Sequence, residues 1–423
     1  MQMLFVVTKL REKVAYMRRL DAPGRITGLD TARGVAILGM IATHIFPLMQ
    51  SNPAGYIFPT WVGASLTGVS SALFVVLAGV GLSLLTKNTT NVFTSRVQLS
   101  IRALILIIIG VLLGFAGSNV AIILVHYGVL FFAAMWFISL SRRALTITAV
   151  SWIVVAPFLH GILTRFMQLQ AGGTASYVDQ WRLWTSPTIL DIIQQPLLTV
   201  WDILFTGYYP VISFLGYVLV GMAIGRANLN KLKTGVVLLI SGAGIYVASR
   251  GLASWFLSDE GFAGRIAHAT NTSLHELSAV AATGSGINTD LVMGAPQWYG
   301  LAVPHSGAPL DVYSTAGAAL GVIGLFLVIT RVTLARRVLF PLTATGMVAL
   351  TAYVVHVIVT GLWPTEWSQT MAVDDPMWSQ AWTMLIIHWL TVAALGTIVF
   401  FAGTRGPLES LLRNVSNGFG SKR

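Results

Sequence analysis

Residues 101–117 read IRALILIIIGVLLGFAG, an apolar run whose only charge is Arg102. About 20 mostly apolar residues in a helix cross the ~30 Å hydrocarbon core of a bilayer. Strands cross lipid only when they close into a barrel, and their residues then alternate in polarity. The unbroken run therefore predicts a membrane-spanning helix.

Similar runs recur along the chain and predict an all-α, polytopic transmembrane helix bundle of ten spans. We place the spans at residues 34–50, 61–85, 101–117, 120–140, 145–163, 208–225, 235–257, 314–332, 341–362 and 380–402. The composition agrees, because 55% of the 423 residues are hydrophobic, only 10% are charged, and the mean hydropathy is +0.76. Soluble proteins carry roughly 25% charged residues. A soluble, disordered or nucleic-acid-binding chain is thus excluded, and the lack of cysteine excludes thiolate chemistry.

The basic residues predict how the chain is oriented, although its net charge of +11 at first resembles a nucleic-acid signal. With the N-terminus placed in the cytoplasm, every basic residue lies on the inner side except Arg165, Arg182, Arg250 and Arg265. Loops on the cytoplasmic side of membrane proteins are enriched in lysine and arginine. We therefore expect both termini to be cytoplasmic.

This topology divides the chain into three parts. Residues 1–33 form a basic cytosolic segment, residues 34–402 the transmembrane domain, and residues 403–423 a cytosolic tail. Two outer loops, 164–207 and 258–313, are too long to be simple turns. Long loops in compact folds are often functional, but the pattern leaves open whether these two are ordered.

The first span carries the most informative polar residues. Its start reads Leu29-Asp30-Thr31-Ala32-Arg33-Gly34, and His44 follows 11 positions after Arg33. Three helical turns separate Arg33 from His44, so both lie on one face, about 16 Å apart along the axis. An ionisable group near the middle of a bilayer must face protein or water. An imidazole there can exchange a proton, or can be a structural residue bonded to a neighbouring helix.

Arg33 and Asp30 also allow two interpretations. They could bind phosphate at a helix N-terminus, or serve as a topology anchor with a capping acid. Weaker candidates in other segments face the same choice between a shared cavity and a structural role. They are His126 and Tyr127 in the fourth span, Tyr353 and His356 in the ninth, Tyr209 ahead of the sixth, and His305 and Ser306 before the eighth. We interpret His388 in the last span as structural.

Several motifs are absent from the sequence. It contains no GxxxxGK[ST] run and no GxSxG elbow, and no span has a His/Glu pair at metal-ligand spacing. An internal ATP motor, a serine-hydrolase elbow and a metal centre are therefore not expected. The scarcity of acidic residues within the spans also argues against an ion-coupled transporter.

The first-span motif, Leu29-Asp30-x-x-Arg33-Gly34 ending in His44, resembles the acyltransferase-3 superfamily. The chain as a whole is similar to bacterial relatives of heparan-α-glucosaminide N-acetyltransferase. Four further stretches carry this resemblance: Thr206-Gly207-Tyr208-Tyr209-Pro210 with Gly221-Met222-x-x-Gly225-Arg226, His126-Tyr127-Gly128, Pro304-His305-Ser306-Gly307, and Met347-x-x-Leu350-Thr351-x-Tyr353-x-x-His356. Together they cover the chain from residue 25 to about residue 360.

The resemblance implies a multispan enzyme of the bacterial inner membrane. Such an enzyme passes an acyl group, often acetyl, from cytosolic acyl-CoA to a sugar hydroxyl or amine of a glycan or glycolipid across the membrane. It implies no metal and no nucleic acid, and leaves a homodimer open. Catalytic roles carry over to Arg33 and His44. We expect acyl-CoA at Asp30, Arg33, Arg96 and Arg102, and the acceptor at His126, Tyr127, Tyr209, His305, Ser306, Tyr353 and His356.

One departure from the heparan-type pattern concerns the outer loop before the second span. The family has a key histidine there, but residues 51–61 contain none, and Gly68 lies near the position of the usual acid. Acetylation of a heparan-like amino sugar is therefore not carried over. Two rival functions remain: a transporter or flippase for a lipid-linked sugar, and a non-catalytic partner of envelope enzymes.

Overall fold

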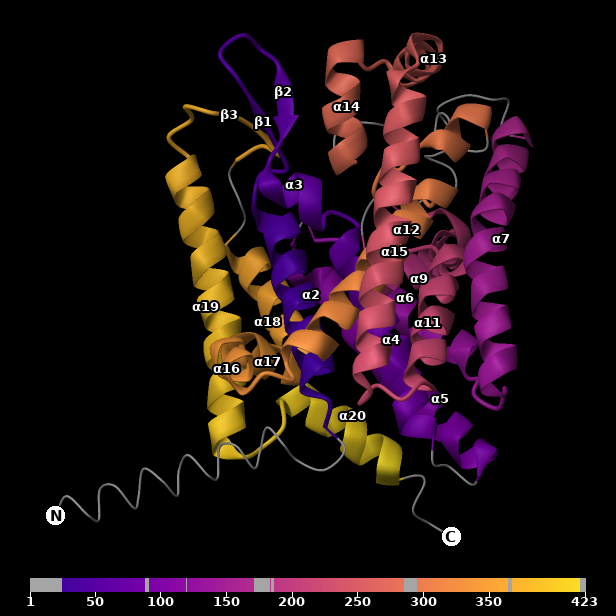
Figure 1. The fold of residues 1–423 in the computed structure, drawn as a ribbon, viewed down its shortest axis with the longest axis vertical. Coiled ribbons are helices and arrows are strands. Elements are labelled where there is room, and N and C mark those ends of the chain that lie inside the picture. Colours follow the sequence, from indigo (N-terminus) through magenta and orange to yellow (C-terminus); the bar gives the residue numbers. More distant parts are fainter. Residues whose placement is uncertain are drawn as a thin grey trace, which may run out of the picture.

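The computed structural model describes residues 25–87, 91–118, 120–170, 183, 186–284, 295–363 and 367–418. Most of the predicted basic segment, residues 1–24, lies outside them, as does Arg182. The described chain is mostly helical, with long helices side by side in one bundle (Figure 1). This arrangement confirms the predicted helical bundle.

Six segments are long and apolar enough to cross a membrane. They are α3 (Trp61–Leu66) with α4 (Val69–Thr86), α5 (Val92–Leu113) with η1 (Gly114–Ala116), α7 (Arg142–Gln170), α12 (Leu232–Ser258), α15 (Pro309–Ile329) and α19 (Trp378–Ala402). Two bent pairs bring the number to eight if each is one span. The first joins α10 (Pro196–Trp201) and η2 (Asp202–Thr206) to α11 (Val211–Gly225) with a 50° bend, and the second joins α17 (Phe340–Met347) to α18 (Ala349–Leu362) with an 87° bend.

The other two predicted spans correspond to helices of a different kind. The span at 120–140 contains only α6 (Leu124–Ala134), because turns follow it and residues 120–123 are not helical. Its 11 residues cover about 16 Å, half of the bilayer core. The span at 34–50 is α2 (Thr27–Ile45), which begins seven residues early and is mostly buried against α4, α15, α17 and α19. Asp30 and Arg33 therefore lie inside a helix rather than before one.

One end of the bundle carries a small sheet that the all-α prediction missed. Its strands β1 (Met49–Ser51), β2 (Ile57–Pro59) and β3 (Thr370–Ala372) have the order β2-β1-β3. β1 runs antiparallel to β2, pairing Met49 with Pro59, and parallel to β3, pairing Met49 with Thr370. Strands of three residues are too short to show the alternating pattern by which strands are recognised.

The long outer loops are largely helical where they are described. Loop 258–313 contains α13 (Glu260–Thr270), α14 (Leu274–Thr283) and η4 (Pro296–Gly300), while loop 164–207 contains α9 (Ile189–Gln194) as well as α10 and η2. Figure 1 shows α13 and α14 at the same end as the sheet, and α20 (Pro407–Gly418) and α16 (Thr333–Val338) toward the opposite end. We call these the sheet end and the α20 end.

Glycines let several helix backbones touch. A Cβ atom on Gly346 of α17 would lie 1.8 Å from the carbonyl oxygen of Asp30 in α2, and one on Gly34 would lie 2.0 Å from that of Leu342. Similar contacts join α4 to α11 at Gly79 and α12 to α15 at Gly242. Small residues at helix interfaces allow such close packing in membranes.

The Gly346 contact predicts a large loss of stability on substitution. Gly346→Ala should lower the apparent melting temperature in detergent, because the added methyl group overlaps backbone that cannot move aside, and overpacking costs about 1–3 kcal/mol. Gly244→Ala is the matched control, because a Cβ atom there has no neighbour within 4 Å. Equal melting temperatures for the two variants would contradict the close contact.

Candidate active site

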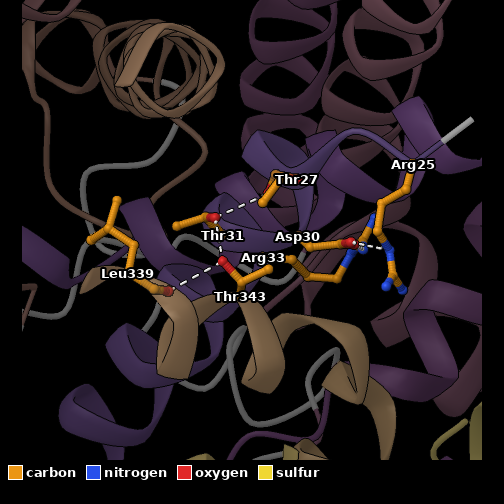
Figure 2. A network of polar contacts seen from close by, with 7 residues as sticks. All are labelled: Arg25, Thr27, Asp30, Thr31, Arg33, Leu339 and Thr343. Atoms are coloured by element: carbon orange, nitrogen blue, oxygen red, sulfur yellow. Dashed lines mark hydrogen bonds and ion pairs between the residues drawn. The ribbon is translucent and has the colours of Figure 1, made fainter. Parts of the chain in front are cut away.

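The first turns of α2 hold a charged cluster near the α20 end. Asp30 accepts a hydrogen bond from Arg33 Nη1 at 2.9 Å and forms an ion pair with Arg25 at 3.2 Å. On the neighbouring face, the Thr31 hydroxyl lies 2.8 Å from that of Thr343 and ties α2 to α17 (Figure 2). Asp30 is thus a counter-ion that orients Arg33.

Arg33 lines a cavity of about 300 Å³, which we call the Arg33 cavity. Arg102 of α5 lines it as well, so two predicted phosphate-binding residues, far apart in the sequence, share one site. The Nε atom of Arg102 is buried and makes no hydrogen bond with a described residue. The rest of the lining is mostly apolar and includes Phe74, Leu77, Leu106, Leu124, Tyr127, Phe131, Leu350 and Leu412.

Arg96, the third predicted phosphate-binding arginine, lies elsewhere. Its guanidinium carbon is 5.0 Å from the ring centroid of Trp136 in a cation–π arrangement. The described residues that line the Arg33 cavity do not include Arg96. The structure therefore brings together only two of the three arginines.

Glu409 of α20 is a cavity residue that sequence reasoning missed. Its carboxylate accepts hydrogen bonds from the backbone N–H groups of Leu350 at 2.8 Å and Thr351 at 3.1 Å, and from the Thr351 hydroxyl at 2.6 Å. The bend before α18 frees these N–H groups, and a carboxylate stabilises such a helix N-terminus. No local sequence pattern could link residues 58 and 59 positions apart in this way.

A second cavity, of about 490 Å³, lies beyond the first turn of α6, and we call it the His126 cavity. Its lining is Gly114, Gly117, Ser118, Val120, Ala121, Ile122, His126, Leu183, Ser186, Pro187, Asp202, Tyr208 and Tyr209. Tyr209 meets the His126 ring edge-on at 5.7 Å and donates a hydrogen bond to the carbonyl of Ala121 at 3.2 Å. Two predicted acceptor-binding residues therefore lie together here.

His126 is only 3% exposed. The carbonyl of Ile122 is near the ring, but neither ring nitrogen has a hydrogen-bond partner of normal geometry among the described residues. Buried polar groups are normally hydrogen-bonded, so this imidazole is a candidate ligand-binding group. Tyr127, the next residue, lines the Arg33 cavity instead and donates to the carbonyl of Phe74 at 3.4 Å. The first turn of α6 thus separates the two cavities.

His305 lies in a strained turn beside the His126 cavity. Its φ angle is +62°, a left-handed conformation that is uncommon outside glycine. Its ring is edge-on to Tyr209 at 5.8 Å. The turn is held from the next helix, because Asp311 accepts a hydrogen bond from Gly307 N–H at 3.1 Å. Ser306 is buried, and its hydroxyl accepts from Ala308 N–H at 3.2 Å.

His44 contacts a histidine from α18. Its Nδ1 atom is 3.1 Å from Nε2 of His356, and the planes of the two rings are nearly parallel, with 5.3 Å between centroids and 5° between planes. His44 is partly exposed, but the described residues lining either cavity do not include it. Tyr353, one turn before His356, is buried and accepts a hydrogen bond from Ile123 N–H at 3.3 Å.

The fold and the site define a polytopic membrane protein with a cavity lined by two arginines toward one end and a histidine–tyrosine cavity beyond a single helical turn. Residues 25–246 match the family model described as heparan-alpha-glucosaminide N-acetyltransferase, catalytic, and residues 265–418 match that of a protein of unknown function (DUF418). The first match covers more than half of the 423 residues, so the chain belongs to the heparan-alpha-glucosaminide N-acetyltransferase catalytic family. None of the curated proteins compared with the chain matches it. The family membership indicates a membrane-bound acetyltransferase.

Proposed function

We propose that the protein transfers an acyl group, most simply acetyl, from acyl-CoA in the Arg33 cavity to a glycan or glycolipid acceptor in the His126 cavity. The observation that carries this proposal is the separation of the two cavities by the first turn of α6. A basic cavity and a cavity with hydrogen-bonding and aromatic groups are then close enough to share one reaction. The Arg33 cavity would face the cytoplasm of a bacterial plasma membrane, and the His126 cavity the outer side.

The donor would be held chiefly by charge. Arginine binds phosphate through two parallel hydrogen bonds, and such charge-assisted bonds are about twice as strong as neutral ones. Arg33, oriented by Asp30, and Arg102 supply two guanidinium groups in one cavity. The apolar lining beyond them suits the pantetheine arm, which would extend toward α6.

The acceptor would be held by polar and aromatic side chains. Binding sites for small molecules combine apolar walls with a few hydrogen-bonding groups, and His126, Tyr209 and Ser186 supply such groups here. His305, whose ring meets that of Tyr209 edge-on, would add a further polar contact for the acceptor hydroxyl or amine.

His44 would act as the general base. It would take the proton of the acceptor O–H or N–H while the oxygen or nitrogen attacks the thioester carbonyl. The C–S bond then breaks, and the leaving thiolate takes the proton back from the imidazolium as CoA–SH. A positioned base contributes about 10²–10⁴-fold to such a reaction.

Sealed proteoliposomes test this function. Acetyl-CoA, which does not cross membranes, is enclosed inside, and a soluble aminosugar or glycolipid acceptor is supplied outside. Acetylated acceptor should accumulate outside, and vesicles without protein should give none. Acceptor that moves across the membrane unmodified would instead support the transporter. If the acceptor is neither acetylated nor moved, the result would support a non-catalytic role.

The His126 cavity predicts a change in acceptor affinity. His126→Ala should raise the KM for the acceptor about tenfold, because a hydrogen bond in a buried site contributes about 0.5–1.5 kcal/mol, and should leave the KM for acetyl-CoA unchanged. Initial rates at varied acceptor concentration measure this. His275→Ala, at a half-exposed site on α14, is the control. A raised KM for acetyl-CoA instead would place the donor in this cavity.

A further inference from the structure

His44 and His356 are joined by a hydrogen bond, and either ring could donate the hydrogen in it. Two neutral imidazoles share one N–H in a hydrogen bond of 3.1 Å between Nδ1 of His44 and Nε2 of His356. A neutral imidazole carries a hydrogen on only one nitrogen. The direction of this bond therefore decides which nitrogen of His44 keeps a lone pair free to accept a proton.

Thr360 settles the direction. Its hydroxyl donates to the backbone carbonyl of His356 at 2.9 Å. A hydroxyl has one hydrogen, so the same oxygen can only accept from Nδ1 of His356, which lies 3.4 Å away. His356 then carries its hydrogen on Nδ1 and presents a lone pair at Nε2.

The hydrogen shared by the two rings therefore belongs to Nδ1 of His44. We infer that His356 is a positioning residue, which fixes the tautomer of His44 so that Nε2 is the atom that accepts the acceptor's proton. This inference rests on the proposed function and deepens it. It assigns to an imidazole the task that a buried aspartate performs for the histidine of a serine-protease triad.

The surroundings of His356 keep this arrangement in place. His356 is 1% exposed, so water does not compete for Nε2. The His388 ring meets it edge-on at 5.3 Å, but Nδ1 of His388 donates to the carbonyl of Met384 at 2.9 Å. The three histidines form no metal-binding group among the described residues. His356, which the sequence suggested as an acceptor-binding residue, thus acts through His44.

Steady-state kinetics test the inference in the full-length protein. His356→Phe keeps a ring but removes both nitrogens, and should lower kcat by roughly 10²-fold or more while both KM values stay unchanged. His356→Gln should recover part of kcat, because a carboxamide oxygen can accept from Nδ1 of His44. His388→Phe is the matched control and should keep kcat. A higher acceptor KM with unchanged kcat in His356→Phe would overturn the inference and make His356 a binding residue.

A second measurement does not depend on activity. ¹⁵N NMR of histidine-labelled wild-type protein in nanodiscs reports which nitrogen carries the hydrogen, and the His44 signals are those that His44→Ala removes. We expect the hydrogen on Nδ1 of His44, whereas hydrogen on Nε2 would overturn the inference. Failure of the proposed function is recognised separately, by full turnover in His44→Ala.

Discussion

His44→Ala should lower the turnover of acyl transfer by roughly 10²–10⁴-fold, the usual contribution of a positioned general base. The residual rate would come from binding donor and acceptor side by side. His44 is the partly exposed member of the contact with His356. Transfer of radiolabelled acetyl groups by purified protein measures the effect under saturating donor and acceptor.

A matched control separates catalysis from damage to the fold. His268→Ala removes an exposed histidine on α13 and should leave turnover unchanged. Comparison of the melting temperatures of the two variants shows whether each is folded. Undiminished turnover in a folded His44→Ala protein would remove the proposed base, although the helical fold and the family assignment would stand.

The second large effect concerns donor binding. Arg33→Gln or Arg102→Gln should raise the KM for acetyl-CoA roughly ten- to hundredfold, because a hydrogen bond to a charged group contributes about 1.5–3 kcal/mol. The effect should shrink when S-acetylpantetheine, which lacks the nucleotide phosphates, replaces acetyl-CoA. Initial rates at varied donor concentration distinguish the two donors.

Arg96 and Arg143 complete this series. The sequence predicts that Arg96 binds the donor, but its guanidinium stacks on Trp136 instead of lining the Arg33 cavity. We therefore expect Arg96→Gln to change the KM for acetyl-CoA only a little. Arg143, exposed at the start of α7, is the charge-matched control. Equal increases in KM for all four arginines would mean that general surface charge, rather than the Arg33 cavity, attracts the donor.

Local periodicity explains how far the sequence could predict this structure. Long apolar runs gave the six full-length candidate spans, and helical spacing correctly placed Arg33 and His44 three turns apart on one helix. It could not show that α6 has only 11 residues, because apolar composition continues past the turn that follows Ala134. Nor could it detect strands of three residues.

Contacts between residues far apart in the sequence leave no local pattern from which they could be predicted. His44 and His356 are 312 positions apart, and only the packing of α18 beside α2 brings their rings together. The sequence predicts a role for each ring, but no local pattern predicts their contact. Glu409 lay in the predicted tail, and its cavity position depends on the 87° bend between α17 and α18. A bend of this kind depends on neighbouring helices, which no single segment encodes.

The glycine contacts between helices bear on how anything crosses this membrane. Carriers of the alternating-access type rock one half of the bundle against the other. A motion that separated Gly346 from Asp30, or Gly242 from Gly321, would lose the close backbone packing at that interface. Such close packing favours a bundle whose helices keep their positions relative to one another. Under the proposed function, only the acyl group would change its covalent partner across the membrane, while the sugar and the nucleotide would each stay on their own side.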